Sequence, residues 1–216
     1  MPAFQKFRPE GEIIGRLVVG YGEIELGLCH CIAQGIGDLD MALKAMFRAR
    51  GETSRIDIAE AMGQKVYVSL GLAAEFREAI DAVRFCLRIR NRYAHSHFYE
   101  DNSGKLAIVG LEEIAKKKIV INDLLRGLTI RHLTEEVLRS QEHHFLYTSG
   151  CIDFVNCEGR FLRNKIKARV FEEAPQKIDR PAEYAQSERR SYRLHRGELG
   201  QAEGRDQGRV QTPWLA

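Results

Sequence analysis

The chain has 216 residues, of which 44% are hydrophobic and 29% are charged. This composition is typical of an ordinary globular protein, and it excludes collagen-like, coiled-coil-only and wholly disordered chains. Its 33 Lys and Arg residues and 30 Asp and Glu residues give a net charge of +3, which is too little for a binder held by bulk positive charge but compatible with a local basic site.

No segment supplies the roughly 18 uninterrupted apolar residues that a membrane span needs. The most apolar candidate, residues 13–24, is broken by glycines and charged residues. The N-terminal residues MPAFQKFRPEGE contain no apolar core of the kind that a signal peptide requires. We therefore expect a cytoplasmic protein that does not associate with membranes.

The five cysteines indicate buried thiols, because their number is odd and no export signal accompanies them. The sequence Cys29-His30-Cys31 suggests a metal site at first sight. However, residues two apart point to different faces of a helix, and no second Cys/His pair follows at zinc-finger spacing. We predict neither a metal site nor another cofactor.

The first half of the chain predicts helices. Apolar residues recur every three or four positions over 12–35, and Asp38 is a good N-cap for a second helix. A turn at 51–54 precedes a short helix over 55–62. The clearest apolar stripe follows in a helix over 70–90.

Short strands are expected after this helix. Residues 101–104, Asp-Asn-Ser-Gly, form a strong turn signal between the apolar runs 97–99 and 106–109, which predicts a β-hairpin. Two further strands are predicted at 119–121 and 128–130, so that the insert is a hairpin or a small meander.

The last predicted element of the domain is a long helix from Thr134, a second N-cap, to about Arg163. Beyond Ala174 the composition shifts toward Pro, Gln, Gly, Arg and Glu. We therefore predict a helical domain over 1–173, with the β insert at about 98–131, and a mobile C-terminal tail over 174–216.

The segment most informative about function is 84–97, RFCLRIRNRYAHSH, where four arginines and two histidines occur in 14 residues. On a helix, Arg84, Arg88, Arg92 and His95 share one face, because they are three or four residues apart. Each pair of like charges at this spacing costs a few tenths of a kcal/mol. A cluster with no interleaved carboxylate therefore indicates a site for an anion.

A second interpretation stays open, in which carboxylates from other helices neutralise these arginines. The candidates are Glu23, Glu25 and Glu75, and we expect Glu25 to be a half-buried structural partner of one of the four arginines, because it flanks the apolar stripe of the first helix. His143 and His144 have no evident link to the segment and are expected at the surface.

The spacing from Arg90 to His95 resembles the R-x4-6-H motif of the HEPN superfamily (higher eukaryotes and prokaryotes nucleotide-binding domains). In this motif a polar residue, often Asn, follows the arginine, as Asn91 does here. The text RNRYAHS is also similar to a segment of HEPN-like proteins that resemble mannitol operon repressors. The resemblance covers about residues 12–165 and implies an antiparallel helical bundle that ends in a long helix. The β insert predicted at about 98–131 departs from the minimal four-helix bundle of that family. The expected fold class is therefore mainly α, a HEPN-like antiparallel helical bundle with a small β insert and a long C-terminal helix.

The residue types suit metal-independent RNA cleavage. A base with a pKa near neutrality must take the 2′-hydroxyl proton, which His95 can do, and the guanidinium of Arg90 can stabilise charge growing on the phosphate. On an unbroken helix, side chains five residues apart point about 140° from each other. Arg90 and His95 therefore converge only if the helix breaks near Asn91 or if two protomers each contribute one motif; the resemblance implies the second, a homodimer.

The resemblance implies a metal-independent endoribonuclease of the toxin or defence type, with Arg90, His95 and Asn91 catalytic and with an antitoxin or regulatory protein as a possible partner. Asn91 would orient the imidazole, and Tyr93 is expected in the core. Phosphate contacts with the substrate would come from Arg88, Arg92 and His97. The alternative is a non-catalytic HEPN-like module, a repressor-like regulator that binds a nucleotide, RNA or a protein.

Overall fold

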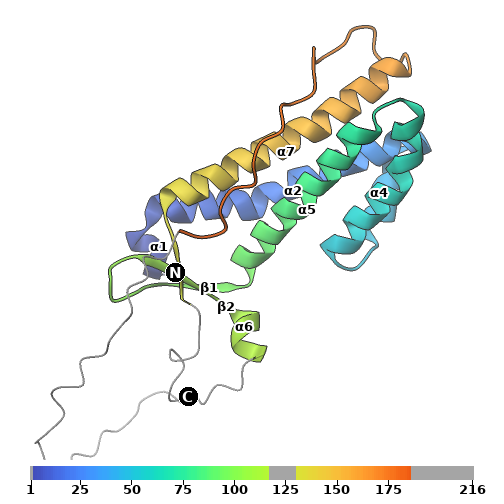
Figure 1. Ribbon diagram of the computed structural model, residues 1–216. Coiled ribbons are helices and arrows are strands. Elements are labelled where there is room, and N and C mark those ends of the chain that lie inside the picture. The colour runs from blue at the N-terminus through green and yellow to red at the C-terminus, as the bar shows by residue number, and fades with distance from the viewer. Residues whose placement is uncertain (1, 117–129, 186–216) are drawn as a thin grey trace, which may run out of the picture.

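The computed structural model describes residues 2–116 and 130–185. Its elements in chain order are α1 (Pro2–Lys6), α2 (Arg8–Ile36), α3 (Leu39–Phe47), α4 (Glu52–Ser69), α5 (Ala73–Ala94), β1 (Ser96–Glu100), β2 (Leu106–Gly110), α6 (Leu111–Lys116), β3 (Arg131–Leu133) and α7 (Glu135–Leu162). The predicted class, mainly α with a small β insert and a long C-terminal helix, is confirmed (Figure 1).

Helices α2, α4, α5 and α7 form the bundle. Helix α5 runs antiparallel to its neighbours, as shown by Cys86 Sγ lying 3.2 Å from Thr148 Oγ1 while Tyr93, further along α5, hydrogen-bonds Gln141, earlier in α7. In contrast, α2 and α7 run in the same direction, since the start of α2 meets the start of α7 and Gln34 meets Asn156 near their ends. The bundle is therefore antiparallel only where α5 takes part (Figure 1).

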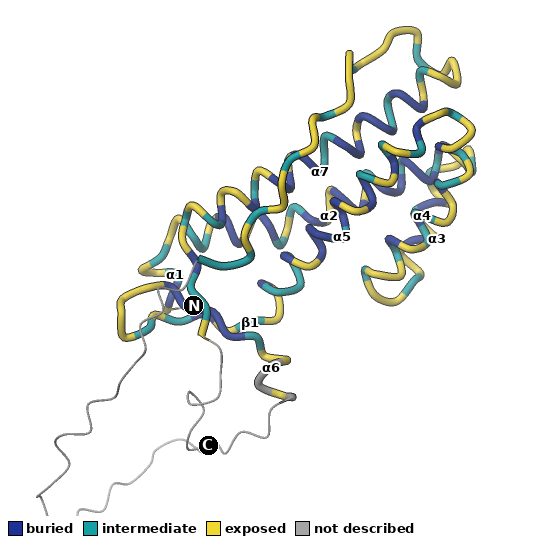
Figure 2. Tube along the Cα trace, viewed as in Figure 1, coloured by how far each residue is buried: buried dark blue, intermediate teal, exposed yellow. Residues whose placement is uncertain are grey.

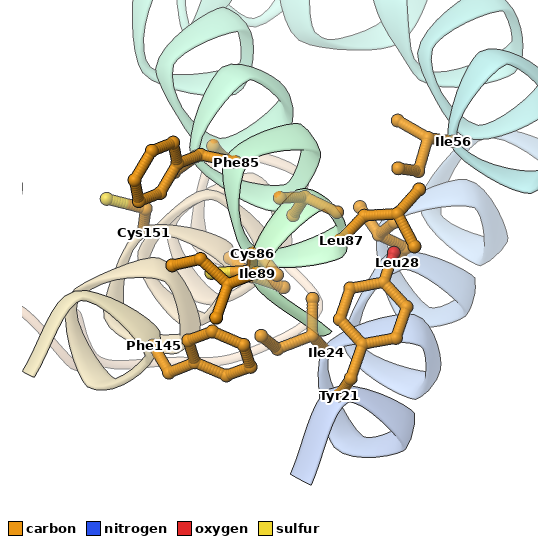
Figure 3. Packing of buried hydrophobic residues seen from close by; sticks show 14 of the residues in the cluster. Tyr21, Ile24, Leu28, Ile56, Phe85, Cys86, Leu87, Ile89, Phe145 and Cys151 are labelled. Atoms are coloured by element: carbon orange, nitrogen blue, oxygen red, sulfur yellow. The ribbon is translucent and has the colours of Figure 1, made fainter. Parts of the chain in front are cut away.

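The core lies where α2, α5 and α7 face one another (Figures 2 and 3). Ile24 and Leu28 of α2, Ile89 of α5 and Phe145 of α7 are all buried there. This follows from apolar residues at three- and four-residue spacing, which form one stripe on each helix. Tyr93 is buried as expected.

Four of the five cysteines are buried as predicted. All five are free; Cys157 is half-buried, and the other four are buried: Cys29, Cys31, Cys86 and Cys151. Burial raises the pKa of Cys86 to about 12, which keeps this thiol protonated at neutral pH.

Local signals place the starts of two helices correctly. Asp38 Oδ1 accepts from the N–H groups of Asp40 and Met41, at 2.9 and 3.3 Å, and Thr134 Oγ1 accepts from Val137 N–H at 3.4 Å. Both predicted N-caps are confirmed.

The predicted end of the short helix at residue 62 is wrong, because α4 continues to Ser69. Gly63 lies within this helix, where a Cβ atom would come within 2.4 Å of Phe76 Cζ. This glycine thus serves the close packing of α4 on α5.

The sheet has the order β1-β2-β3 and is antiparallel throughout. Strands β1 and β2 confirm the predicted runs 97–99 and 106–109. The predicted strand 119–121 lies outside the described residues. Of 128–130 only residue 130 is described, and the third strand begins one residue later.

The hairpin turn is closed by Asp101, whose Oδ1 accepts from the backbone of Ser103 and of Lys105 at 2.9 and 3.1 Å. Its Oδ2 lies 2.6 Å from His132 Nε2 of β3. Burial alone would raise the pKa of Asp101, but the hydrogen bonds from Ser103, His132 and Lys105 hold it well below its usual value. Asp101 therefore links the β1–β2 turn to β3.

The predicted start of the tail at residue 174 is too early. After α7 the chain turns back along the bundle toward the sheet (Figure 1), and we call residues 174–185 the strap. Ile178 and Tyr184 of the strap pack against the core. Pro175 lies so close to Gly150 of α7 that a Cβ atom added to this glycine would be 3.6 Å from Pro175 Cγ. The composition of this segment is mostly polar, which is why the sequence indicated a tail. A few apolar side chains nevertheless hold it against the bundle. Residues 186–216 lie outside the described residues.

Candidate functional site

Helix α5 runs without a break through the motif and ends at Ala94. His95 is its C-cap, and the His95 N–H donates to Asn91 O at 3.0 Å as in a regular helix. The break near Asn91 that would bring the two motif side chains together is therefore not present. Within one protomer, Arg90 and His95 leave the helix in directions about 140° apart.

Arg90 is held by its neighbours. Its Nη1 lies 2.8 Å from Asn91 Oδ1 and 3.2 Å from Glu52 Oε1, at the start of α4. Asn91 thus accepts from Arg90 and does not orient the imidazole, contrary to the prediction. The side chain of Arg90 is 26% exposed, so its guanidinium is both fixed and accessible at one edge.

A buried polar group lies behind Arg90. Burial raises the pKa of Tyr21, and the charges of Glu25 and Glu52 add to this effect, whereas Arg90 opposes it. Neither Tyr21 Oη nor Arg90 Nε has a hydrogen-bond partner in the part of the chain that the structure describes. The packing of α2 on α5 therefore leaves two buried polar atoms that no described residue satisfies.

His95 is at the surface. Its backbone N–H and C=O are both engaged, the latter by Leu111 N–H at 3.0 Å. Its imidazole makes no hydrogen bond or ion pair with any of residues 2–116 and 130–185. The fold thus presents an imidazole with no partner among the described residues, five residues after the fixed Arg90.

Arg84 is neutralised by carboxylates of another helix, as the second interpretation expected, although the residues are not the three candidates. Its Nη2 lies 2.9 Å from Asp57 Oδ1 and 2.7 Å from Glu60 Oε2, both on α4. These contacts arise because α4 lies alongside α5. The position of α4 is not evident from the spacing of charges within α5.

Glu25 is a buried structural partner of an arginine, but the predicted arginine is wrong. Glu25 Oε1 accepts from Arg55 Nη1 at 2.8 Å, and both side chains are largely buried. It does not pair with an arginine of the segment 84–97. The other two proposed partners, Glu23 and Glu75, form no ion pair with that segment within the described residues.

Arg88 and Arg92 share one carboxylate, that of Glu183 in the strap. Arg92 Nη2 donates to Glu183 Oε2, while Arg88 Nε lies 4.0 Å from Oε1. The ring of Tyr184 lies under two guanidinium groups, 4.7 Å from Cζ of Arg92 and 4.4 Å from Cζ of Arg131. The strap therefore contacts two of the three predicted phosphate contacts, Arg88 and Arg92, but covers only Arg92.

His97, the third predicted contact, is exposed on β1 and stacks on Tyr99 with ring centroids 5.9 Å apart. Arg88 is 53% exposed and Arg92 only 15%. Arg88 and His97 are thus accessible, whereas Arg92 becomes accessible only if the strap moves.

The expected surface position is correct for His143 but wrong for His144, which is 2% exposed. Its ring meets that of Phe85 edge-on at 4.7 Å and lies 5.6 Å from Tyr147. Burial lowers the pKa of His144 to about 4, and the charge of Arg180 contributes. A sequence signal was present, since Tyr147 and Cys151 follow residue 144 by three and seven positions and so extend one face of the helix.

Three observations concern the whole of the described chain. Within residues 2–116 and 130–185 no group of three or more His, Cys, Asp or Glu side chains could hold a metal ion. None of the helices in those ranges is both long and apolar enough to span a bilayer. No family model, curated protein or solved structure matches this chain, so the resemblance to the HEPN superfamily stays a prediction.

Proposed function

We propose that the protein is a HEPN-like, metal-independent endoribonuclease whose active site forms in a cleft between two protomers. One observation carries this proposal: α5 fixes Arg90 and, at its exposed end, presents the unengaged imidazole of His95. The unbroken helix is why a second protomer is needed. The resemblance adds a toxin or defence role, with a protein antitoxin as a possible partner.

In this proposal His95 takes the proton of a 2′-hydroxyl, and the 2′-oxygen attacks the adjacent phosphorus. A 2′,3′-cyclic phosphate forms as the bond to the 5′-oxygen breaks, and the protonated imidazole from the other protomer donates a proton to the leaving oxygen. Arg90 stabilises the charge on the non-bridging oxygens. Both described contacts of its guanidinium use Nη1, so Nη2 is available to the phosphate.

The second candidate is a non-catalytic module that binds a nucleotide, RNA or a protein. The ion pairs of the arginine cluster favour it, because Arg84, Arg88, Arg90 and Arg92 all have carboxylate neighbours. Such pairing is expected where the motif serves mainly to hold α5 in place.

Cleavage of a mixed RNA pool in EDTA separates the two candidates. We expect the purified chain to produce 2′,3′-cyclic phosphate ends and His95→Ala to lose about 100-fold or more of the rate. His143→Ala is the matched control, because it removes an exposed histidine from α7. Equal cleavage by His95→Ala would overturn the role of His95, and no cleavage by a folded dimer would favour the binding module.

The dimer has its own test in sedimentation of the full chain at micromolar concentration. A dimer is expected, because one protomer cannot bring Arg90 and His95 together. A monomer that cleaves RNA at the same concentration would contradict the shared site.

A further inference from the structure

The strap places a carboxylate and an aromatic ring side by side on three arginines. Glu183 lies against Arg88 and Arg92, and the ring of Tyr184 lies under the guanidinium groups of Arg92 and Arg131. Arg131 Nη1 also donates to Tyr184 Oη at 2.6 Å. The Glu183 carboxylate and the Tyr184 ring thus contact the same cluster of arginines.

Buried groups fix this arrangement. Gln141 is fully buried, accepts from Tyr93 Oη, and donates through Nε2 to Ala182 O at 2.8 Å. The N–H of Ala185 donates to His132 O at 3.0 Å, at the edge of the sheet. The bundle and the sheet therefore hold the backbone on both sides of Glu183 and Tyr184.

The same chemistry suits a nucleotide. Guanidinium groups bind phosphate oxygens as they bind carboxylates, and they stack on nucleobases as they do on aromatic side chains. Arg92 Nη1 is buried and has no partner among the described residues, so the carboxylate leaves a donor of this cluster unused. A phosphate offers more acceptor oxygens than a carboxylate does.

We propose that Arg88, Arg92 and Arg131 form a nucleotide-binding site, which Glu183 and Tyr184 occupy as an internal mimic of the ligand. The phosphate would lie between Arg88 and Arg92, and the base would stack on Arg131. Arg88, Arg92 and His95 share a face of α5, since they are three or four residues apart. Taken with the proposed function, on which this extension rests, the bound nucleotide belongs to the RNA substrate next to the scissile bond.

Binding of a fluorescent 2′-O-methyl RNA hexamer tests the site on the full chain. This probe lacks the nucleophilic hydroxyl, so it stays intact whether or not the protein is a ribonuclease. We expect Glu183→Gln to bind it about fivefold more tightly than the unaltered chain, because the competing ion pair is lost. Glu173→Gln is the matched control, since it removes an exposed strap-proximal charge that has no ion pair within the described residues.

Adding Arg92→Gln to Glu183→Gln should remove the gain. Equal binding by the Glu183→Gln and Glu173→Gln chains would overturn the proposal. Tyr184→Ala provides a second release of the strap, and thermal melting shows whether each variant is folded. Tighter binding of the hexamer by both Glu183→Gln and Tyr184→Ala supports the proposal that the strap mimics the ligand.

Competition on the Glu183→Gln chain tests the ligand class. Adenosine monophosphate should displace the hexamer at a concentration about tenfold below that of inorganic phosphate, because only the nucleotide fills the position of the Tyr184 ring. Equal potency would overturn the nucleotide assignment. A chain that binds as expected but does not cleave RNA overturns the ribonuclease alone, whereas cleavage without an effect of Glu183→Gln overturns the strap site alone.

Discussion

Two histidines show how differently the core and the end of α5 treat the same side chain. His144 is buried between the rings of Phe85 and Tyr147, with neither ring nitrogen hydrogen-bonded within the described residues. His95 is exposed at the C-cap of α5. The first is an apolar packing group that resists protonation, and the second presents its ring to solvent. The position on the helix, rather than the residue type, decides between the two roles.

The pH dependence of stability should expose this difference most strongly. The pKa of His144 falls from an ordinary 6.5 to about 4 on folding, so between these values the unfolded chain binds more protons than the folded one. The contribution of neutral His144 to the free energy of unfolding is therefore fully present above pH 6.5. It decreases as the pH falls toward 4, by about 2–3 kcal/mol in all. Urea unfolding at a series of pH values measures the loss.

His144→Leu should flatten the slope that this histidine produces, whereas His95→Ala should leave it unchanged. If the two variants had the same slope as the unaltered chain, the loss at low pH would arise from carboxylates, and the depressed pKa of His144 would be wrong.

The next effect in size concerns Gln141, on the same buried face of α7. Gln141→Leu leaves the buried hydroxyl of Tyr93 and the backbone carbonyl of Ala182 without their partner. We expect a loss of about 2 kcal/mol in the free energy of unfolding, since an unsatisfied buried polar group costs about 1–3 kcal/mol. The double variant Tyr93→Phe/Gln141→Leu should lose less than the sum of the two single losses, because the hydroxyl is then absent. Simple additivity would show that the two side chains do not interact.

The parts of the fold that were predictable depend on residues near one another in the chain. The apolar stripe of α5, the N-caps Asp38 and Thr134 and the turn at 101–104 are local patterns, and each is found where expected. The end of α5 was placed less well, because the helix predicted over 70–90 continues to Ala94, which makes His95 its C-cap.

The partners of the motif were not predictable in the same way. Glu183 reaches Arg92 across 91 residues of sequence, and Glu52 reaches Arg90 because the start of α4 lies beside the end of α5. No spacing within 84–97 encodes these contacts, so they depend on tertiary structure alone. His144 is an intermediate case, because its helical spacing indicated burial although its polarity indicated the surface.

Arg90 should show a smaller effect than the two buried groups, because it is fixed yet partly exposed. Arg90→Ala removes the contacts with Glu52 and Asn91, and we expect a loss of about 1 kcal/mol in the free energy of unfolding. Arg77→Ala is the matched control, as Arg77 is an exposed arginine of the same helix with no ion pair in the described chain. Equal small losses for both would mean that Arg90 is not held by the fold.

The smallest expected change is in the stability of His95→Ala. The imidazole is exposed and has no partner among residues 2–116 and 130–185, so its removal should alter the free energy of unfolding by less than about 0.5 kcal/mol. Thermal and urea unfolding beside the His143→Ala control measure this. A loss above 1 kcal/mol would place His95 among the residues that hold the end of α5, like Arg90. A change within the expected range means that any effect of the same substitution on RNA cleavage or binding arises at the site itself.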